Sequence, residues 1–144
     1  MTPNWPFTLA ELTAGLRRHF DDNGLTIVSY EEMPLYGQQH VSAGDFRGLI
    51  VRARGSRSSR VDHTLRLVVK QAVRATRAGL VGGGRREMGV YQSFATQLPL
   101  ETPQLVAAHS QGQWLILEHI PIFHPPGQWT AENYLQAART LAHL

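Results

Sequence analysis

Lys70 is the residue whose type and position most clearly suggest chemistry. It is the only lysine in the sequence, beside thirteen arginines, and it follows the mostly apolar stretch 65–69. Arginine is a planar fork suited to bidentate contacts, whereas lysine is a compact charge on a flexible stem, so the two are not interchangeable in a confined site. The sequence therefore indicates a functional role for Lys70. The alternative is that Lys70 only protects the edge of a strand from pairing with another chain.

Glu87 is the second candidate, because it interrupts an apolar helical face. Glu87, Tyr91, Phe94 and Leu98 recur at the spacing of one side of a helix. Burying an ionised carboxylate without a partner is costly, so a glutamate on such a face is usually paired. The sequence predicts that Lys70 is this partner. The alternative is that Glu87 turns into water near the positive end of the helix dipole.

The elements that position these two residues are expected to form an α+β fold. A helix is predicted from about Leu9 to Phe20, where Thr8 caps, Glu11 reaches back and Phe7 packs on Leu12. Further elements are strands over 25–36, 46–54 and 64–71, a helix over 85–98, strands over 104–109 and 113–118, and a last helix capped by Thr130 with Trp129 against Tyr134. The first three strands should form an antiparallel meander and the last two a hairpin.

Two short segments, 79–86 and 44–46, resemble functional motifs without matching them. The segment 79–86 has the glycine spacing of a P-loop but carries Arg85 and Arg86 where that loop needs Lys and Ser or Thr, so its triple glycine is expected to let the following helix swing. The segment 44–46 is expected to be a turn rather than a metal-binding motif, and the Gly- and Ser-rich segment 55–60 a solvated loop. The seven histidines are scattered without metal-ligand spacing, so no metal site is predicted.

Composition narrows the function classes. The chain has 144 residues, 42% of them hydrophobic, which suits one ordinary globular domain. It has no cysteine, so a disulfide framework and a thiolate metal site are excluded. We expect a cytoplasmic protein, because neither a signal peptide nor an apolar run of membrane-spanning length is present. The net charge of +3 comes from dispersed arginines, so neither nucleic-acid nor membrane binding is expected.

The order of these features resembles the N-terminal, ATP-binding lobe of the aminoglycoside phosphotransferase and choline kinase superfamily of small-molecule kinases, which share the protein-kinase-like fold. The resemblance is carried by Leu67-Val68-Val69-Lys70, by Arg86-Glu87 with Tyr91 and Leu98-Pro99, by Thr102-Pro103-Gln104-Leu105-Val106, and by Trp114-Leu115-Ile116-Leu117-Glu118. It implies a five-stranded antiparallel sheet with one packed helix, an extra N-terminal helix, and a C-terminal helix that starts a second lobe. In this fold a strand lysine holds ATP phosphates and is held by a helix glutamate.

The resemblance also implies roles for individual residues. Lys70 would bind the phosphates, Glu87 would position Lys70, and Leu117 would lie beside the adenine. The Glu118 carbonyl and the Ile120 amide would make the adenine hydrogen bonds. The nucleotide-covering turn would span 37–44, with Gly37, Gly44 and the candidate phosphate donor Ser42, although its two glycines are spaced more widely than in protein kinases.

The carboxylates that such a kinase needs are not in this sequence. Phosphoryl transfer requires one carboxylate to orient the acceptor hydroxyl and others to hold Mg²⁺, and the last aspartate here is Asp62. The resemblance therefore implies a lobe over 1–118, a hinge over 119–128 and the first helix of an incomplete second lobe over 129–144, a fragment without catalytic residues. We expect the ATP-binding part of a phosphotransferase that acts on a small-molecule hydroxyl, with Mg²⁺ held by the other lobe. The alternative is a non-catalytic kinase-like module that binds a protein or forms a homodimer.

Overall fold

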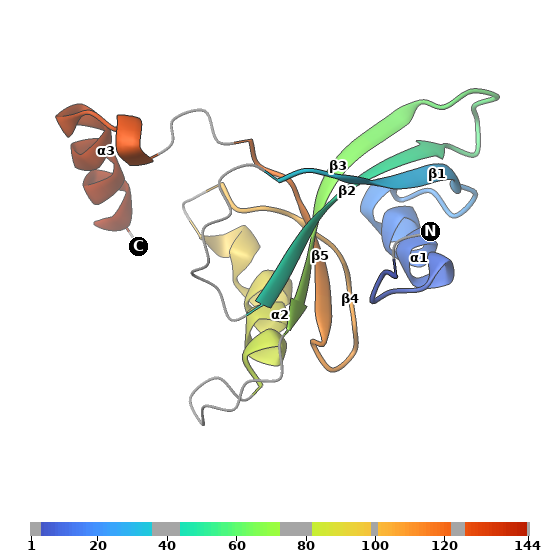
Figure 1. The fold of residues 1–144 in the computed structure, drawn as a ribbon, viewed down its shortest axis with the longest axis horizontal. Helices are drawn as coiled ribbons and strands as arrows, with labels where there is room; N and C mark the ends of the chain where they lie inside the picture. The colour runs from blue at the N-terminus through green and yellow to red at the C-terminus, as the bar shows by residue number, and fades with distance from the viewer. Residues whose placement is uncertain (1–3, 36–43, 73–81, 99–100, 122–125, 144) are drawn as a thin grey trace.

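The computed structural model describes residues 4–35, 44–72, 82–98, 101–121 and 126–143. It shows an α+β fold with the element order α1 (Leu9–Phe20), β1 (Thr26–Met33), β2 (Gly44–Arg54), β3 (His63–Ala72), α2 (Gly83–Ser93), the 3₁₀ turn η2 (Ala95–Gln97), β4 (Leu105–Ala108), β5 (Trp114–Glu118), the 3₁₀ turn η3 (Pro126–Gln128) and α3 (Ala131–Leu141). Figure 1 shows α1 and α2 on opposite sides of β4 and β5, with α3 set apart from the sheet. The predicted α+β class is confirmed.

The sheet joins a three-stranded meander to a hairpin, as the sequence predicts. Its order is β1-β2-β3-β5-β4, and every pairing is antiparallel. The prediction extended the first strand to Tyr36, which lies outside the described residues. β1 ends at Met33, directly before Pro34, because proline has no N–H to donate to the ladder. The five strands therefore form one open antiparallel sheet with β1 and β4 at its edges.

One predicted turn is wrong. The segment 44–46 is the beginning of β2, where Gly44 pairs with Ala72 and Phe46 with Lys70. The reason is that β3 extends to Ala72 and supplies backbone partners along the whole of this segment. Phe46 is thereby placed directly opposite Lys70.

Helix α1 packs on one face of the sheet, and the hydrophobic core lies between the two. Its start shows the predicted capping box: the Thr8 backbone N–H donates to Glu11 Oε2 at 2.8 Å, and Glu11 N–H donates to Thr8 Oγ1 at 3.2 Å. Leu12 and Leu16 are fully buried. They belong to a cluster with Phe7, Leu25, Leu49, Val51, Ala53, Leu67, Val69, Val106, Ala107, Trp114 and Ile116. Alternation along β2 and β3 sends every second side chain into this cluster and the others to the opposite face.

Helix α2 differs from its prediction at the C-terminal end. It stops at Ser93 and is followed by η2, so the predicted apolar stripe does not continue. Phe94 is 59% exposed, and Leu98 is extended, with φ −72° and ψ 140°. The residue before a proline is disfavoured in the helical region, and Pro99 follows Leu98 directly. Only Glu87 and Tyr91 of the predicted stripe lie on α2 and are partly buried.

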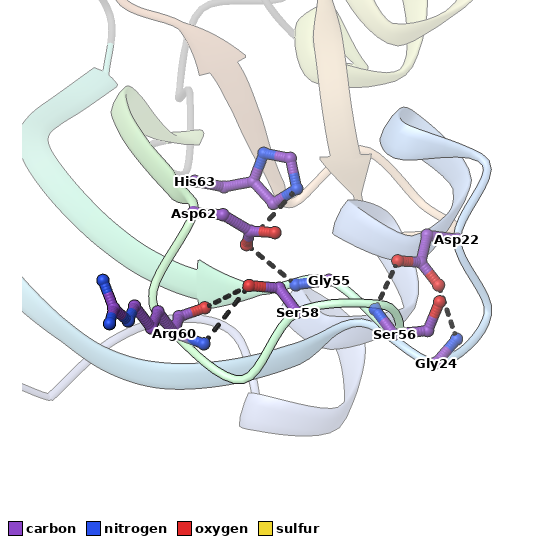
Figure 2. Close-up of polar contacts among 8 residues, drawn as sticks. All are labelled: Asp22, Gly24, Gly55, Ser56, Ser58, Arg60, Asp62 and His63. Atoms are coloured by element: carbon purple, nitrogen blue, oxygen red, sulfur yellow. Dashed lines mark hydrogen bonds and ion pairs between the residues drawn. The ribbon is translucent and has the colours of Figure 1, made fainter.

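Two aspartates hold the turn between β2 and β3 (Figure 2). Asp22, just after α1, accepts the backbone N–H of Ser56 at 2.7 Å. Asp62, directly before β3, accepts the N–H of Gly55 at 2.9 Å, and its Oδ1 lies 3.6 Å from His63 Nε2. The segment predicted as a solvated loop is therefore an exposed turn that is tied to α1 and β3.

Because these two carboxylates accept hydrogen bonds in the fold, we expect the fold to lose stability in acid. Backbone hydrogen bonds, from Ser56 to Asp22 and from Gly55 to Asp62, hold the pKa of each carboxyl below its ordinary value. A group with a lowered folded-state pKa stabilises the fold above its unfolded pKa, about 3.9, and this stabilisation is lost as the pH falls through the folded-state pKa. We therefore compare how far the free energy of unfolding falls when the pH is lowered below about 4. This fall should be smaller in the double variant Asp22→Asn with Asp62→Asn than in the parent.

Urea unfolding at a series of pH values measures this difference. Asp21→Asn is the control, because it removes a neighbouring carboxylate that accepts no hydrogen bond from another described residue. A double variant with the same acid dependence as the parent would show that the two carboxylates do not stabilise the turn.

Helix α3 has the predicted start and an exposed apolar face. Thr130 Oγ1 accepts from Asn133 N–H, and the Trp129 and Tyr134 rings have centroids 5.1 Å apart. Tyr134, Leu135 and Leu141 are each more than half exposed. In the part of the chain that the structure describes, no helix has both the length and the apolar character needed to cross a membrane.

Candidate functional site

The predicted ion pair between Lys70 and Glu87 is confirmed. Lys70 Nζ lies 2.5 Å from Glu87 Oε2. Val69 points into the core beneath α1, so alternation along β3 places Lys70 on the opposite face, where α2 brings Glu87 to it. The two side chains keep about a quarter of their surface exposed, 26% and 28%. The pair is thus shielded on part of its surface and open to a ligand on the rest.

Two aromatic residues flank this pair. Lys70 Nζ lies 5.3 Å from the centroid of the Phe46 ring, within the range of a cation–π contact. Tyr91 follows Glu87 by one helical turn. Burial, and after it the negative charge of Glu87, raises the pKa of Tyr91 above its ordinary value, so the phenol stays neutral. Phe46 and Glu87 contact the ammonium, and Tyr91 lies close enough to Glu87 to sense its charge.

An apolar row crosses the sheet beside Lys70, on the same face. Met33 pairs with Gly48, Gly48 with Val68, and Val68 with Leu117, so these four residues stand side by side on β1, β2, β3 and β5. Met33 and Leu117 are buried. The row is two residues from Lys70 along β3, a distance of roughly 7 Å. A cation and an apolar surface are therefore adjacent.

Gly48 shapes the middle of this row. A Cβ at Gly48 would collide with the Met33 carbonyl oxygen, would lie 2.5 Å from Met33 Cγ and would lie 3.1 Å from Leu35 Cδ2. The absence of a side chain lets Met33 lean over β2. Met33, Gly48 and Phe46 were not predicted as site residues, because their place beside Lys70 follows from strand register, which a single sequence shows only after the strands are paired.

The other predicted site residues lie in several places. Leu117 is buried on β5, one residue before the strand ends. Glu118 is exposed, its backbone N–H donates to the Gln104 carbonyl, and its Oε2 accepts Gln104 N–H at 3.3 Å. Ile120 is exposed, and its amide donates to no other described residue. Gly44 is the first residue of β2.

Two predicted residues, Gly37 and Ser42, lie outside the described residues. Of the predicted covering turn, only the last residue, Gly44, lies within the described part of the chain. The remainder of the site consists of Lys70, its partner Glu87, and the apolar row.

The exposed part of Lys70 can bind an anion beside an apolar part of the sheet. A lysine ammonium has three N–H donors, and Glu87 uses one of them. The other donors and the exposed part of Nζ are suited to phosphate, and the partly buried Val68 of the apolar row lies next to them on β3. Within the described residues, no group of three or more His, Asp or Glu side chains is placed to hold a metal ion.

Comparison of the chain with protein-family models, with curated proteins and with solved structures gave no match. The functional interpretation therefore depends on the geometry of the site.

Proposed function

We propose that this chain is the nucleotide-binding lobe of an ATP-dependent phosphotransferase that acts on a hydroxyl of a small molecule. One observation carries the proposal: the ion pair of 2.5 Å between Lys70 on β3 and Glu87 on the helix that follows. In kinases a strand lysine held by a helix glutamate binds the ATP phosphates, and both must be in place for transfer. The single lysine of the chain stands in this position.

The apolar row supports the choice of a nucleotide over a simple anion. Phosphate alone would need only the ammonium, whereas the partly buried Val68 and the buried Leu117 paired with it make the surroundings of the ammonium apolar. Beyond β5, which ends at Glu118, the amide of Ile120 is free of partners among the described residues. An adenine on this row could accept that N–H and use the Glu118 carbonyl, contacts that involve backbone only.

The proposal places the remaining catalytic groups outside this chain. No aspartate follows Asp62, so a second lobe would supply the carboxylate that orients the acceptor and those that hold Mg²⁺. With ATP bound, Mg²⁺ held by that lobe would neutralise charge on the phosphates. Lys70 would hold the α- and β-phosphates from the sheet side, and Glu87 would keep Nζ directed at them.

The proposal is tested by labelling with an acyl-phosphate derivative of ATP that transfers its acyl group to a nearby lysine amine. Lys70 is the only lysine, so peptide mass spectrometry reads one side chain. We expect acylation of Lys70 that excess MgATP suppresses and that is weaker in Glu87→Gln, because the ammonium is then no longer held. The α-amino group of Met1 is the internal control, and its labelling should not respond to ATP.

This experiment distinguishes the two candidate functions. Labelling of Lys70 that is insensitive to ATP, or absent while Met1 reacts, would reject the nucleotide site. That result would favour a non-catalytic module, for which the exposed apolar residues Tyr134, Leu135 and Leu141 of α3 would be the contact surface.

A further inference from the structure

Helix α2 carries Glu87, the partner of Lys70, but packs only loosely on the sheet. None of its residues is buried, in contrast to α1, which buries Leu12, Gly15 and Leu16. Val90 on α2 and Phe94 just beyond it are exposed. The helix is therefore not positioned by hydrophobic packing of the kind that fixes α1, and another contact must determine whether Glu87 reaches Lys70.

That contact is between two glycines. A Cβ at Gly84, in the first turn of α2, would collide with the carbonyl oxygen of Gly112 and would lie 3.1 Å from its carbonyl carbon. A Cβ at Gly112, in the turn between β4 and β5, would lie 2.7 Å from Arg85 Cα and would collide with the backbone of Gly84. The backbone of α2 thus touches the backbone of the hairpin turn, with no side chain between them.

Neighbouring glycines show that this closeness is particular to one point. At Gly83 and Gly89, both within α2, a Cβ would have no neighbouring atom within 4 Å. Gly82 has nearly the same left-handed φ as Gly112, 72° against 68°, and also faces open space. The chain therefore contains a matched control for each of the two contacting glycines.

The turn that receives α2 is connected directly to Lys70. Ala72, two residues after Lys70 on β3, donates its N–H to the carbonyl of Gln113, the residue after Gly112. Lys70 itself pairs with Leu115 on β5. On α2, Gly84 and Glu87 are three residues apart and share a side of the helix. A short rigid path therefore runs from Gly84 through the turn and β3 to Lys70, and back through the ion pair to Glu87.

We propose that the Gly84–Gly112 backbone contact is the positioning contact of the site: it holds α2 against the sheet so that Glu87 meets Lys70. A side chain at either position would push the start of α2 away and separate the pair. The consequence for nucleotide binding rests on the proposed function, whereas the effect on the ion pair does not require a nucleotide.

The test observes the Lys70 ammonium directly. Labelling with ¹⁵N-lysine gives one side-chain signal, because the chain has one lysine. The parent and Glu87→Gln define the paired and unpaired signals. We expect Gly84→Ala and Gly112→Asn to move the signal to that of Glu87→Gln, while Gly83→Ala and Gly82→Asn keep the parent signal. Asparagine is used at 82 and 112 because it tolerates the left-handed region.

Each outcome decides the proposal. A parent-like signal in Gly84→Ala and Gly112→Asn would overturn it, and so would identical signals in the parent and Glu87→Gln, since no pair would then exist to be positioned. Amide hydrogen exchange in β2 and β3 shows whether the sheet remains folded. General unfolding in Gly84→Ala would also overturn the proposal, because the contact would then support the whole fold. Failure of ATP to protect Lys70 from acylation would reject the nucleotide site and leave these spectra unaffected.

Discussion

Replacement of Lys70 by methionine is expected, under the proposed function, to lower phosphoryl transfer by a factor of about 10² to 10³. Methionine retains the length and the apolar stem of lysine and removes only the ammonium that faces Glu87 at 2.5 Å. The loss is large because a preorganised charge at a partly shielded site stabilises the phosphates without reorganisation during the reaction. Steady-state kinetics with saturating MgATP, together with the affinity for the nucleotide, measure it.

The fold should be nearly unchanged in this variant. Both side chains of the pair are about a quarter exposed, and ion pairs near the surface contribute about 1 kcal/mol or less. Arg60→Met is the matched control, because it removes the same charge from the exposed β2–β3 turn. We expect the control to retain activity. Near-normal turnover in Lys70→Met, with the melting temperature preserved, would contradict the assignment of Lys70 as the phosphate-binding residue.

Leu16→Ala is expected to lower the free energy of unfolding by about 2–5 kcal/mol, the largest stability effect that we predict. Leu16 is fully buried at the centre of the contact between α1 and the sheet, so its removal loses transfer energy and leaves a cavity. Equilibrium urea unfolding, with the m value compared between variants, measures the change.

Leu9→Ala on the same helix provides the comparison. Leu9 is 51% exposed, so the same substitution should cost less than about 1 kcal/mol. Equal losses in the two variants would mean that α1 does not pack on the sheet as the structure shows. A loss in Leu16→Ala without a change at the Lys70 ammonium would show that the α1 face and the α2 face are energetically separate.

Much of the fold could be predicted because its signals are local. Thr8 with Glu11 and Thr130 with Asn133 form capping boxes through residues three apart, and the first of these pairs was read directly from the sequence. The strand cores followed from runs of β-branched and aromatic residues. The ion pair between Lys70 and Glu87 was also predictable, because a lone carboxylate on an apolar face requires a partner of opposite charge.

Other features could not be predicted because they depend on residues far apart in the chain. Phe94 and Leu98 have helical spacing with Glu87, yet α2 ends before them at Ser93, so the helical face that carries Glu87 and Tyr91 does not continue to them. From its composition, the turn held by Asp22 and Asp62 is predicted to be a solvated loop. The hydrogen bonds that the two carboxylates accept from backbone N–H groups cannot be recognised from residue types.

By itself, the sequence determined that this is an α+β chain with one lysine on a strand and a glutamate on the next helix suited to pair with it. These properties depend on residue type and on spacing within one element, where hydrophobic periodicity and charge act. Only the tertiary structure decided that Phe46 stands opposite Lys70, that Met33 and Gly48 lie in the row through Val68, and that Gly84 rests on Gly112. Strand register and backbone-to-backbone contact decide those positions, and both arise only when the chain has closed on itself.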